Sequence, residues 1–103
     1  MERIEKIIEM IQNNGADSFL QHALALEYIK ISKDDEALHQ FTELLTREPD
    51  YIGSYYHLGK LHERNGRITE AIAVYENGMI IAKKLNDNHS FSELRGAYEE
   101  LAL

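Results

Sequence analysis

The five histidines are the side chains most capable of chemistry, and their spacing argues against a metal site. His57 and His62 are five positions apart, so they do not share a helix face, and no pair has the His-x-x-x-His spacing of helical zinc sites. Cysteine is absent, which excludes thiolate ligands and disulfides. We expect no metal and no cofactor, with His62 packed in the core and with His22, His39 and His89 at the surface or rim.

Serine, histidine and aspartate all occur, yet no motif places them for catalysis. The chain resembles neither the nucleophile elbow of a serine hydrolase nor a glycine-rich phosphate loop. Acidic runs such as Glu2, Glu5 and Glu9 are most simply solvated helix faces. We therefore expect no catalytic residues and a protein that is not an enzyme.

Composition predicts one small globular domain covering residues 1–103. Hydrophobic residues make up 44% of the chain, enough for a core, whereas the formal net charge is −7. That charge argues against nucleic acid or an anionic membrane as a partner, since both attract basic surfaces. The N-terminal residues lack the apolar run of a signal peptide, and no segment approaches the length of an apolar membrane span. We expect a cytoplasmic protein.

Helices must position these side chains, because apolar residues recur at helical spacing and no segment alternates like a strand. Turns are marked by residues 13–15, 32–33, 65–66 and 86–88 and by Pro49, the single proline. Six helices are expected, at about 2–12, 18–31, 34–48, 50–64, 68–85 and 90–102. Short turns between them predict antiparallel neighbours.

Polar residues at the helix starts predict the N-caps. Either Asp17 or Ser18 can cap the second helix, and Asp50 is expected to cap the fourth. Ser90 and Glu93 have the spacing of a capping box, which predicts that Ser90 opens the last helix. Gly15 is expected to adopt the left-handed conformation that ends the first helix.

The chain resembles itself, because residues 18–51 align without a gap onto residues 52–85. The aligned pairs are those that a two-helix packing unit needs: Leu24 with Leu58, Ala25 with Gly59, Ala37 with Ala71 and Phe41 with Tyr75. The small residues let two helices approach closely, and the aromatic ring fills the space beside them. This pattern and its period resemble the tetratricopeptide repeat, although Gln21 replaces the opening aromatic residue and Lys83 replaces the closing proline.

The resemblance implies an all-α fold, an α-solenoid of antiparallel helix pairs. Residues 18–51 and 52–85 are the two expected repeats. The helix in residues 1–13 matches the second half of a unit and is expected to act as an N-terminal cap, and residues 90–102 are expected to form a C-terminal capping helix. Two units alone rarely bury a continuous core, so the flanking helices are expected to supply the missing burial.

The same resemblance implies a concave groove that holds peptides and is lined by the first helix of each repeat. The residues at the lining positions are His22, Leu26, Lys30, Tyr56, Lys60 and Arg64. Lys30, Lys60 and Arg64 would form a local basic patch, which suits a partner peptide that bears carboxylates. The alternative is that these cations simply solvate their helices, and that Phe19, Leu26 and Ile29 pack against the N-terminal helix.

We predict a non-catalytic protein–protein interaction module, a scaffold that binds a peptide segment or a partner protein in this groove. The alternative is structural self-association, in which the groove or the isoleucine-rich N-terminal helix forms a homodimer. A clamp for the C-terminal carboxylates of heat-shock chaperones is not expected, because His22, Leu26 and His57 stand where such a clamp needs Lys and Asn.

Overall fold

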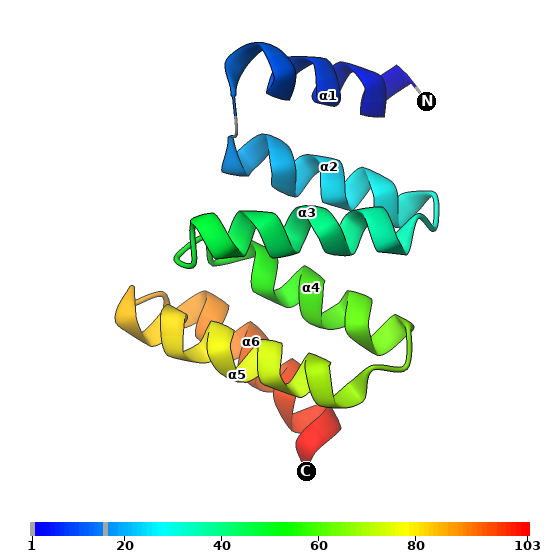
Figure 1. Cartoon of the computed structure of the whole chain (residues 1–103). Helices are drawn as coiled ribbons and strands as arrows, with labels where there is room; N and C mark the ends of the chain where they lie inside the picture. Colours follow the sequence, from blue (N-terminus) through cyan, green and yellow to red (C-terminus); the bar gives the residue numbers. More distant parts are fainter. Residues whose placement is uncertain (1, 16) are drawn as a thin grey trace. The chain divides into compact units, whose positions relative to one another are not determined.

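The described part of the chain folds into six α-helices, which confirms the expected all-α fold (Figure 1). The computed structural model describes residues 2–15 and 17–103, and these ranges contain no β-strand. The helices are α1 (Glu2–Asn14), α2 (Ser18–Lys30), α3 (Asp34–Arg47), α4 (Gly53–Arg64), α5 (Ile68–Lys84) and α6 (Asn88–Ala102). The chain divides into two compact parts, Met1–Glu48 and Pro49–Leu103, which we call unit 1 and unit 2.

In unit 1, α2 packs against both α1 and α3. Ile4 and Ile7 of α1 are buried against Leu24 of α2, and these three side chains form one apolar cluster. The remaining core residues of this unit are fully buried side chains of α2 and α3: Ala25, Ala37, Phe41 and Leu44. Because burying a large apolar side chain contributes about 1.5–3 kcal/mol, α1 is held onto α2 mainly by its two isoleucines.

In unit 2, α5 packs against both α4 and α6, and α4 also contacts α6. Two glycines allow these close approaches. A Cβ atom on Gly59 would overlap the Tyr75 ring, and a Cβ atom on Gly78 would lie 2.8 Å from Cβ of Tyr55 and 2.9 Å from Cδ1 of Leu94. The expectation that a small residue faces a large aromatic ring between the two helices is therefore confirmed at Gly59.

The turns after α2 and α4 have the same backbone conformation, at positions that the alignment of the two repeats pairs. Ser32 (φ 60°) and Gly66 (φ 75°) both adopt the left-handed conformation. In each turn the next amide donates to a carbonyl five positions back, Lys33 to Tyr28 and Arg67 to His62, at 2.9 Å in both cases. The repeat period is therefore present in the backbone as well as in the side chains.

The helix starts confirm one predicted cap and correct another. Asp17 caps α2, because its carboxylate accepts a hydrogen bond from the amide of Leu20 at 3.0 Å. Asp50 does not cap α4, which begins only at Gly53 without a side-chain cap. The Asp50 carboxylate instead pairs with Lys84 of α5 at 3.0 Å.

The last helix begins earlier than the predicted capping box. Asp87 is the N-cap of α6, and its carboxylate accepts hydrogen bonds from the amide and the hydroxyl of Ser90, at 3.0 and 2.7 Å. Ser90 is therefore the third residue of the helix rather than its cap. The expectation for Gly15 is confirmed, since it has a φ of 81° directly after α1.

Candidate functional site

The six predicted groove residues fall on two helices, three on each. His22, Leu26 and Lys30 are spaced by four along α2, and Tyr56, Lys60 and Arg64 stand at the equivalent positions of α4. Side chains four apart lie on one face of a helix, so each set forms a continuous stripe. We call these stripes the α2 face and the α4 face, and describe each within its own unit.

Two of the three predicted residues on the α2 face are half-buried and the third is exposed. His22 and Leu26 are half-buried, and the His22 ring meets the ring of Phe41 edge-on at 5.9 Å between centroids, whereas Lys30 is exposed. Phe19 lies on the same stripe by helical spacing and is 68% exposed. The alternative in which Phe19 packs against the N-terminal helix is therefore wrong, and Phe19 belongs to the α2 face.

The positive charge on the α2 face is compensated by a carboxylate that the sequence analysis did not predict. Glu27 accepts a hydrogen bond from Lys30 at 2.9 Å and pairs with Arg3 of α1 at 3.2 Å. The Lys30 hydrogen bond, more than the bond from Arg3, holds the pKa of Glu27 below its usual value despite partial desolvation. The signal was present in the sequence, since Glu27 and Lys30 have the i, i+3 spacing of a helical ion pair.

The α4 face carries a cation held over an aromatic ring. The Lys60 ammonium lies 5.5 Å from the centroid of the Tyr56 ring and 3.5 Å from the carboxylate of Glu63. Glu63 also accepts a hydrogen bond from the hydroxyl of Tyr75, which crosses from α5. Burial and then this bond raise the pKa of Tyr75 far above its ordinary value, so its hydroxyl remains a donor. Arg64 is exposed at the end of α4.

Unit 1 contains a further hollow that was not predicted. It has a volume of about 340 Å³ and is lined by all three helices of the unit. Ile8 and Ile11 of α1 and Leu24 of α2 supply apolar lining, and Gln40 and Glu43 of α3 supply polar lining. We call this hollow the α3 groove. Gln21, which replaces the opening aromatic residue, also lines it, and this substitution was the sequence signal that could have indicated it.

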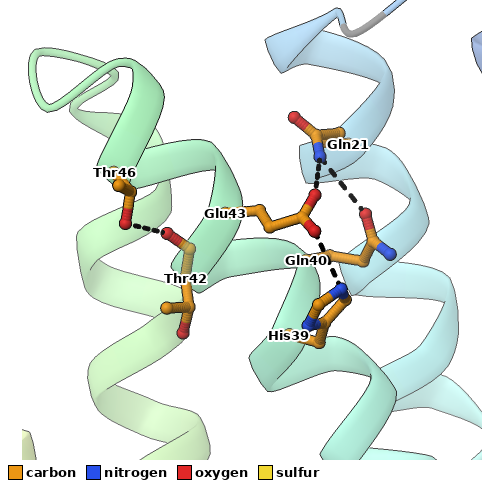
Figure 2. Close-up of polar contacts among 6 residues, drawn as sticks. All are labelled: Gln21, His39, Gln40, Thr42, Glu43 and Thr46. Carbon is orange, nitrogen blue, oxygen red and sulfur yellow. Dashed lines mark hydrogen bonds and ion pairs between the residues drawn. The ribbon is translucent and has the colours of Figure 1, made fainter.

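A polar network lines the α3 groove (Figure 2). The amide nitrogen of Gln21 points toward Gln40 and Glu43, with distances of 3.5 and 3.4 Å to their side-chain oxygens. The Glu43 carboxylate also lies 2.9 Å from Nε2 of His39. Gln21 is only 4% exposed, and its side-chain oxygen has no hydrogen-bond partner in the described part of the chain.

Unit 2 has an apolar hollow between α5 and α6, with a volume of about 320 Å³. Met79 and Ile80 of α5 and Phe91 and Tyr98 of α6 line it. Lys83 closes one side, with its ammonium 5.2 Å from the centroid of the Phe91 ring. Ile80 is 66% exposed beside this hollow.

The four histidines whose places were predicted lie in those places. His62 is buried, and its Nδ1 accepts a hydrogen bond from Nε of Arg67 at 2.9 Å, as suits a core histidine. His39 and His89 are exposed and His22 is half-buried. Among the residues that the structure describes, no three His, Asp or Glu side chains lie close enough to hold a metal ion. Within the same residues, no helix combines the length and apolar character needed to cross a membrane.

Comparison with known proteins gives relatives of the same architecture. A family model described as tetratricopeptide repeat matches residues 52–79. The crystal structure of a tetratricopeptide repeat domain protein from Salinibacter ruber has 41% identity and a TM-score of 0.79, covering 84% of this chain and 96% of that one. A solution structure of a Salinibacter ruber tetratricopeptide repeat domain protein has 39% identity and a TM-score of 0.82, covering 86% and 90%.

A protein from Bordetella parapertussis shares the fold at 24% identity, with a TM-score of 0.84 and coverage of 96% of this chain and 86% of that one. No protein of curated function matches the chain. Three findings indicate the same family. They are the family match over part of unit 2, the equivalent turns of the two repeats, and the 41% identity to a tetratricopeptide repeat domain of which 96% is covered. The chain belongs to the tetratricopeptide repeat family, whose members serve generally as protein–protein interaction modules and are typically not enzymes.

Proposed function

We propose that the chain is a non-catalytic binding module that holds a segment of a partner protein on the α2 face and the α4 face. The observation that carries the proposal is Phe19, which is 68% exposed on the same stripe as Leu26 and Lys30. Large aromatic side chains are the residues that most often anchor protein interfaces when a partner buries them. An exposed phenylalanine beside a half-buried leucine and an exposed lysine suits an amphipathic partner segment.

An acidic partner segment is the finer part of the proposal. Lys30, Lys60 and Arg64 are the cations of the two faces, but Glu27 and Glu63 already pair with the two lysines. A carboxylate of the partner would have to compete with these glutamates, so we expect charge to influence the association rate and salt dependence more than the affinity. Apolar contact with Phe19 and Leu26 then supplies most of the affinity.

The repeat boundaries belong to the same proposal, with repeats at 18–51 and 52–85 and capping helices at 1–13 and 90–102. The equivalent turns at Ser32 and Gly66 support the spacing of the repeats. The packing of Ile4 and Ile7 onto Leu24 supports a capping role for α1. A cytoplasmic location, expected from the sequence, stays part of this proposal.

The test compares two exposed apolar side chains of nearly equal exposure. Phe19 is 68% exposed on the α2 face, and Ile80 is 66% exposed on α5, which carries neither face. Phe19→Ala and Ile80→Ala are each used to capture partners from extract of the source cells, after both variants are shown to unfold like the parent. We expect Phe19→Ala to lose the partners that the parent captures and Ile80→Ala to keep them.

Capture that survives Phe19→Ala would contradict the proposal. Light scattering after size-exclusion chromatography is run on the same samples. A tight dimer that dissociates in Phe19→Ala but not in Ile80→Ala would instead support self-association through the α2 face.

A further inference from the structure

The α3 groove lies on the side of α2 opposite to the α2 face. At 3.6 residues per turn, Gln21, Leu24 and Tyr28 share one side of the helix, whereas Leu26 and Lys30 share the other. A ligand in the α3 groove would therefore contact different residues from a partner on the α2 face. A binding site in this groove is thus independent of the proposed function.

The groove continues into a second hollow with an acidic rim. The second hollow is lined by Asp35 and Glu36 and shares Tyr28, His39 and Gln40 with the first. Together with Glu43 this places three carboxylates of α3 along the two hollows. Two basic side chains lie beside these carboxylates: Lys33 is 3.9 Å from Glu36, and Nε2 of His39 is 2.9 Å from Glu43.

Gln21 supplies a second observation that is independent of the acidic rim. A buried amide oxygen without a partner costs about 1–3 kcal/mol, and the Gln21 oxygen has none in the described residues. The amide nitrogen makes only long contacts, at 3.4 and 3.5 Å. A rotation of this amide would present its oxygen to the groove, where a donor from a ligand could bind it together with the Glu43 carboxylate.

The other unit shows that this polar lining is not needed for folding. The aligned positions of the second repeat hold Tyr55 for Gln21, and Val74 and Asn77 for the two polar residues of α3. Tyr55 is buried and packs against Gly78, and none of the three residues is charged. The same helix pair therefore forms with an uncharged, more apolar set at these positions.

We propose that the α3 groove binds a lysine or arginine side chain from an extended basic segment of a partner protein. The aliphatic part of that side chain lies on Ile8, Ile11 and Leu24, and its charged end meets Glu43 and the Gln21 amide oxygen. The neighbouring basic residues of the segment face the acidic rim. Charge complementarity and the combination of apolar floor with buried acceptor select this ligand over an acidic or purely apolar one.

The probe is a fluorescein-labelled, end-blocked hexapeptide that alternates lysine and leucine, with a glutamate–leucine hexapeptide as its control. Binding is measured by fluorescence anisotropy at constant salt on the full chain. The groove variant is Glu43→Gln. The matched control is Glu70→Gln in unit 2, which removes the same charge from an exposed site at the position equivalent to Glu36.

We expect the lysine peptide to bind more tightly than the glutamate peptide, and Glu43→Gln to weaken it about tenfold, the effect of one hydrogen bond to a charged group. Glu70→Gln should change the affinity less than twofold. Equal weakening by the two variants would mean attraction to net charge alone and would overturn the proposal. So would NMR shift changes on the unmodified chain that leave the side-chain amides of Gln21 and Gln40 unmoved, whatever the stability of the variants.

Discussion

Units 1 and 2 each contain an equivalent pair of helices, α2 with α3 and α4 with α5, but the larger buried side chain lies on a different helix of the pair in each unit. In unit 1, Leu44 is a fully buried large residue and Gln21 is the smaller, polar neighbour. In unit 2, the equivalent positions hold Gly78 and Tyr55, and the Tyr55 side chain lies where a Cβ atom on Gly78 would be. The large buried side chain therefore lies on α3 in unit 1 and on α4 in unit 2.

The different side chains at the position of Gln21 and Tyr55 also change the surface of the two units. Where Tyr55 fills unit 2 with an aromatic ring, the shorter Gln21 leaves unit 1 with the α3 groove and a buried polar group. The residues that pack the two helices together are similar at equivalent positions of the two units, whereas the residues that could bind a ligand differ. Substitutions at equivalent positions of the two units test this difference.

The largest effect is expected from Gly59→Ala. The added Cβ would overlap the Tyr75 ring, so α4 and α5 must move apart, at a cost of about 3 kcal/mol. The equivalent residue in unit 1 is already alanine, and Ala25→Gly should cost about 1–2 kcal/mol through lower helix propensity and the loss of a buried methyl group. Urea unfolding of both variants measures the difference. Equal costs would contradict the close approach in unit 2.

The next-largest effect is the pH dependence of stability caused by His62, whose equivalent in unit 1 is Tyr28. Burial, and then the nearby charge of Arg67, lower the pKa of His62 from 6.5, against a smaller opposing influence of Glu70. The unfolded chain therefore binds the proton more tightly, and stability is lost as the pH falls through about 6.5. Protonation also ends the hydrogen bond that His62 accepts from Arg67.

We expect the free energy of unfolding to fall between about pH 7.5 and pH 5, and to fall less in His62→Gln. Burial also lowers the pKa of His57, so the variant should reduce the slope without abolishing it. If the free energy of unfolding depends on pH as steeply in His62→Gln as in the parent, this histidine does not cause the pH dependence. Denaturant unfolding at a series of pH values gives the measurement.

A smaller, stabilising effect is expected from Gln21→Leu. The substitution removes the unpartnered amide oxygen and keeps a side chain of similar size, which should raise the free energy of unfolding by about 1 kcal/mol. Gln40→Leu, on the half-buried wall of the same groove, should change it by less than about 0.5 kcal/mol. A loss of stability in Gln21→Leu would show that the Gln21 network supports the fold.

The smallest effect tests the equivalent turns. Ser32 has a φ of 60°, a conformation that costs a residue with a Cβ atom about 1 kcal/mol relative to glycine. Ser32→Gly should therefore stabilise the chain by about 0.5–1 kcal/mol, and Gly66→Ser should destabilise it by a similar amount. Thermal unfolding of the pair checks this, and effects of the same sign would contradict the equivalence of the turns.

The sequence predicted the six helices because their apolar spacing and their turn residues agree along the chain. It could not predict the roles of Asp50 and Ser90, because these depend on competition between nearby groups. Asp50 forms an ion pair with Lys84, the last residue of α5, and the Asp87 carboxylate accepts hydrogen bonds from both the amide and the hydroxyl of Ser90. Such choices depend on tertiary geometry rather than on local sequence.

For the candidate site, the sequence predicted which residues share the α2 and α4 faces, because spacing by four decides this. It did not predict that Phe19 is exposed, since this depends on how α1 packs against α2. The pairing of Glu27 with Lys30 could have been predicted, because the two residues have the i, i+3 spacing of a helical ion pair. The α3 groove needed the structure because its lining comes from three helices. In the sequence, only the replacement of an aromatic residue by Gln21 indicated it.

The most direct test of the comparison transfers side chains from the second repeat into the α3 groove. Gln40→Val with Glu43→Asn copies Val74 and Asn77, while Leu44 and Gln21 stay in place. The affinity for the lysine–leucine hexapeptide is measured together with the free energy of unfolding. We predict a loss of stability of about 1–3 kcal/mol, because the buried Gln21 amide nitrogen loses the Gln40 and Glu43 oxygens as acceptors, and an affinity at least about tenfold lower. Undiminished affinity in a folded variant would contradict the claim that the polar side chains of α3 give unit 1 a binding site that unit 2 lacks.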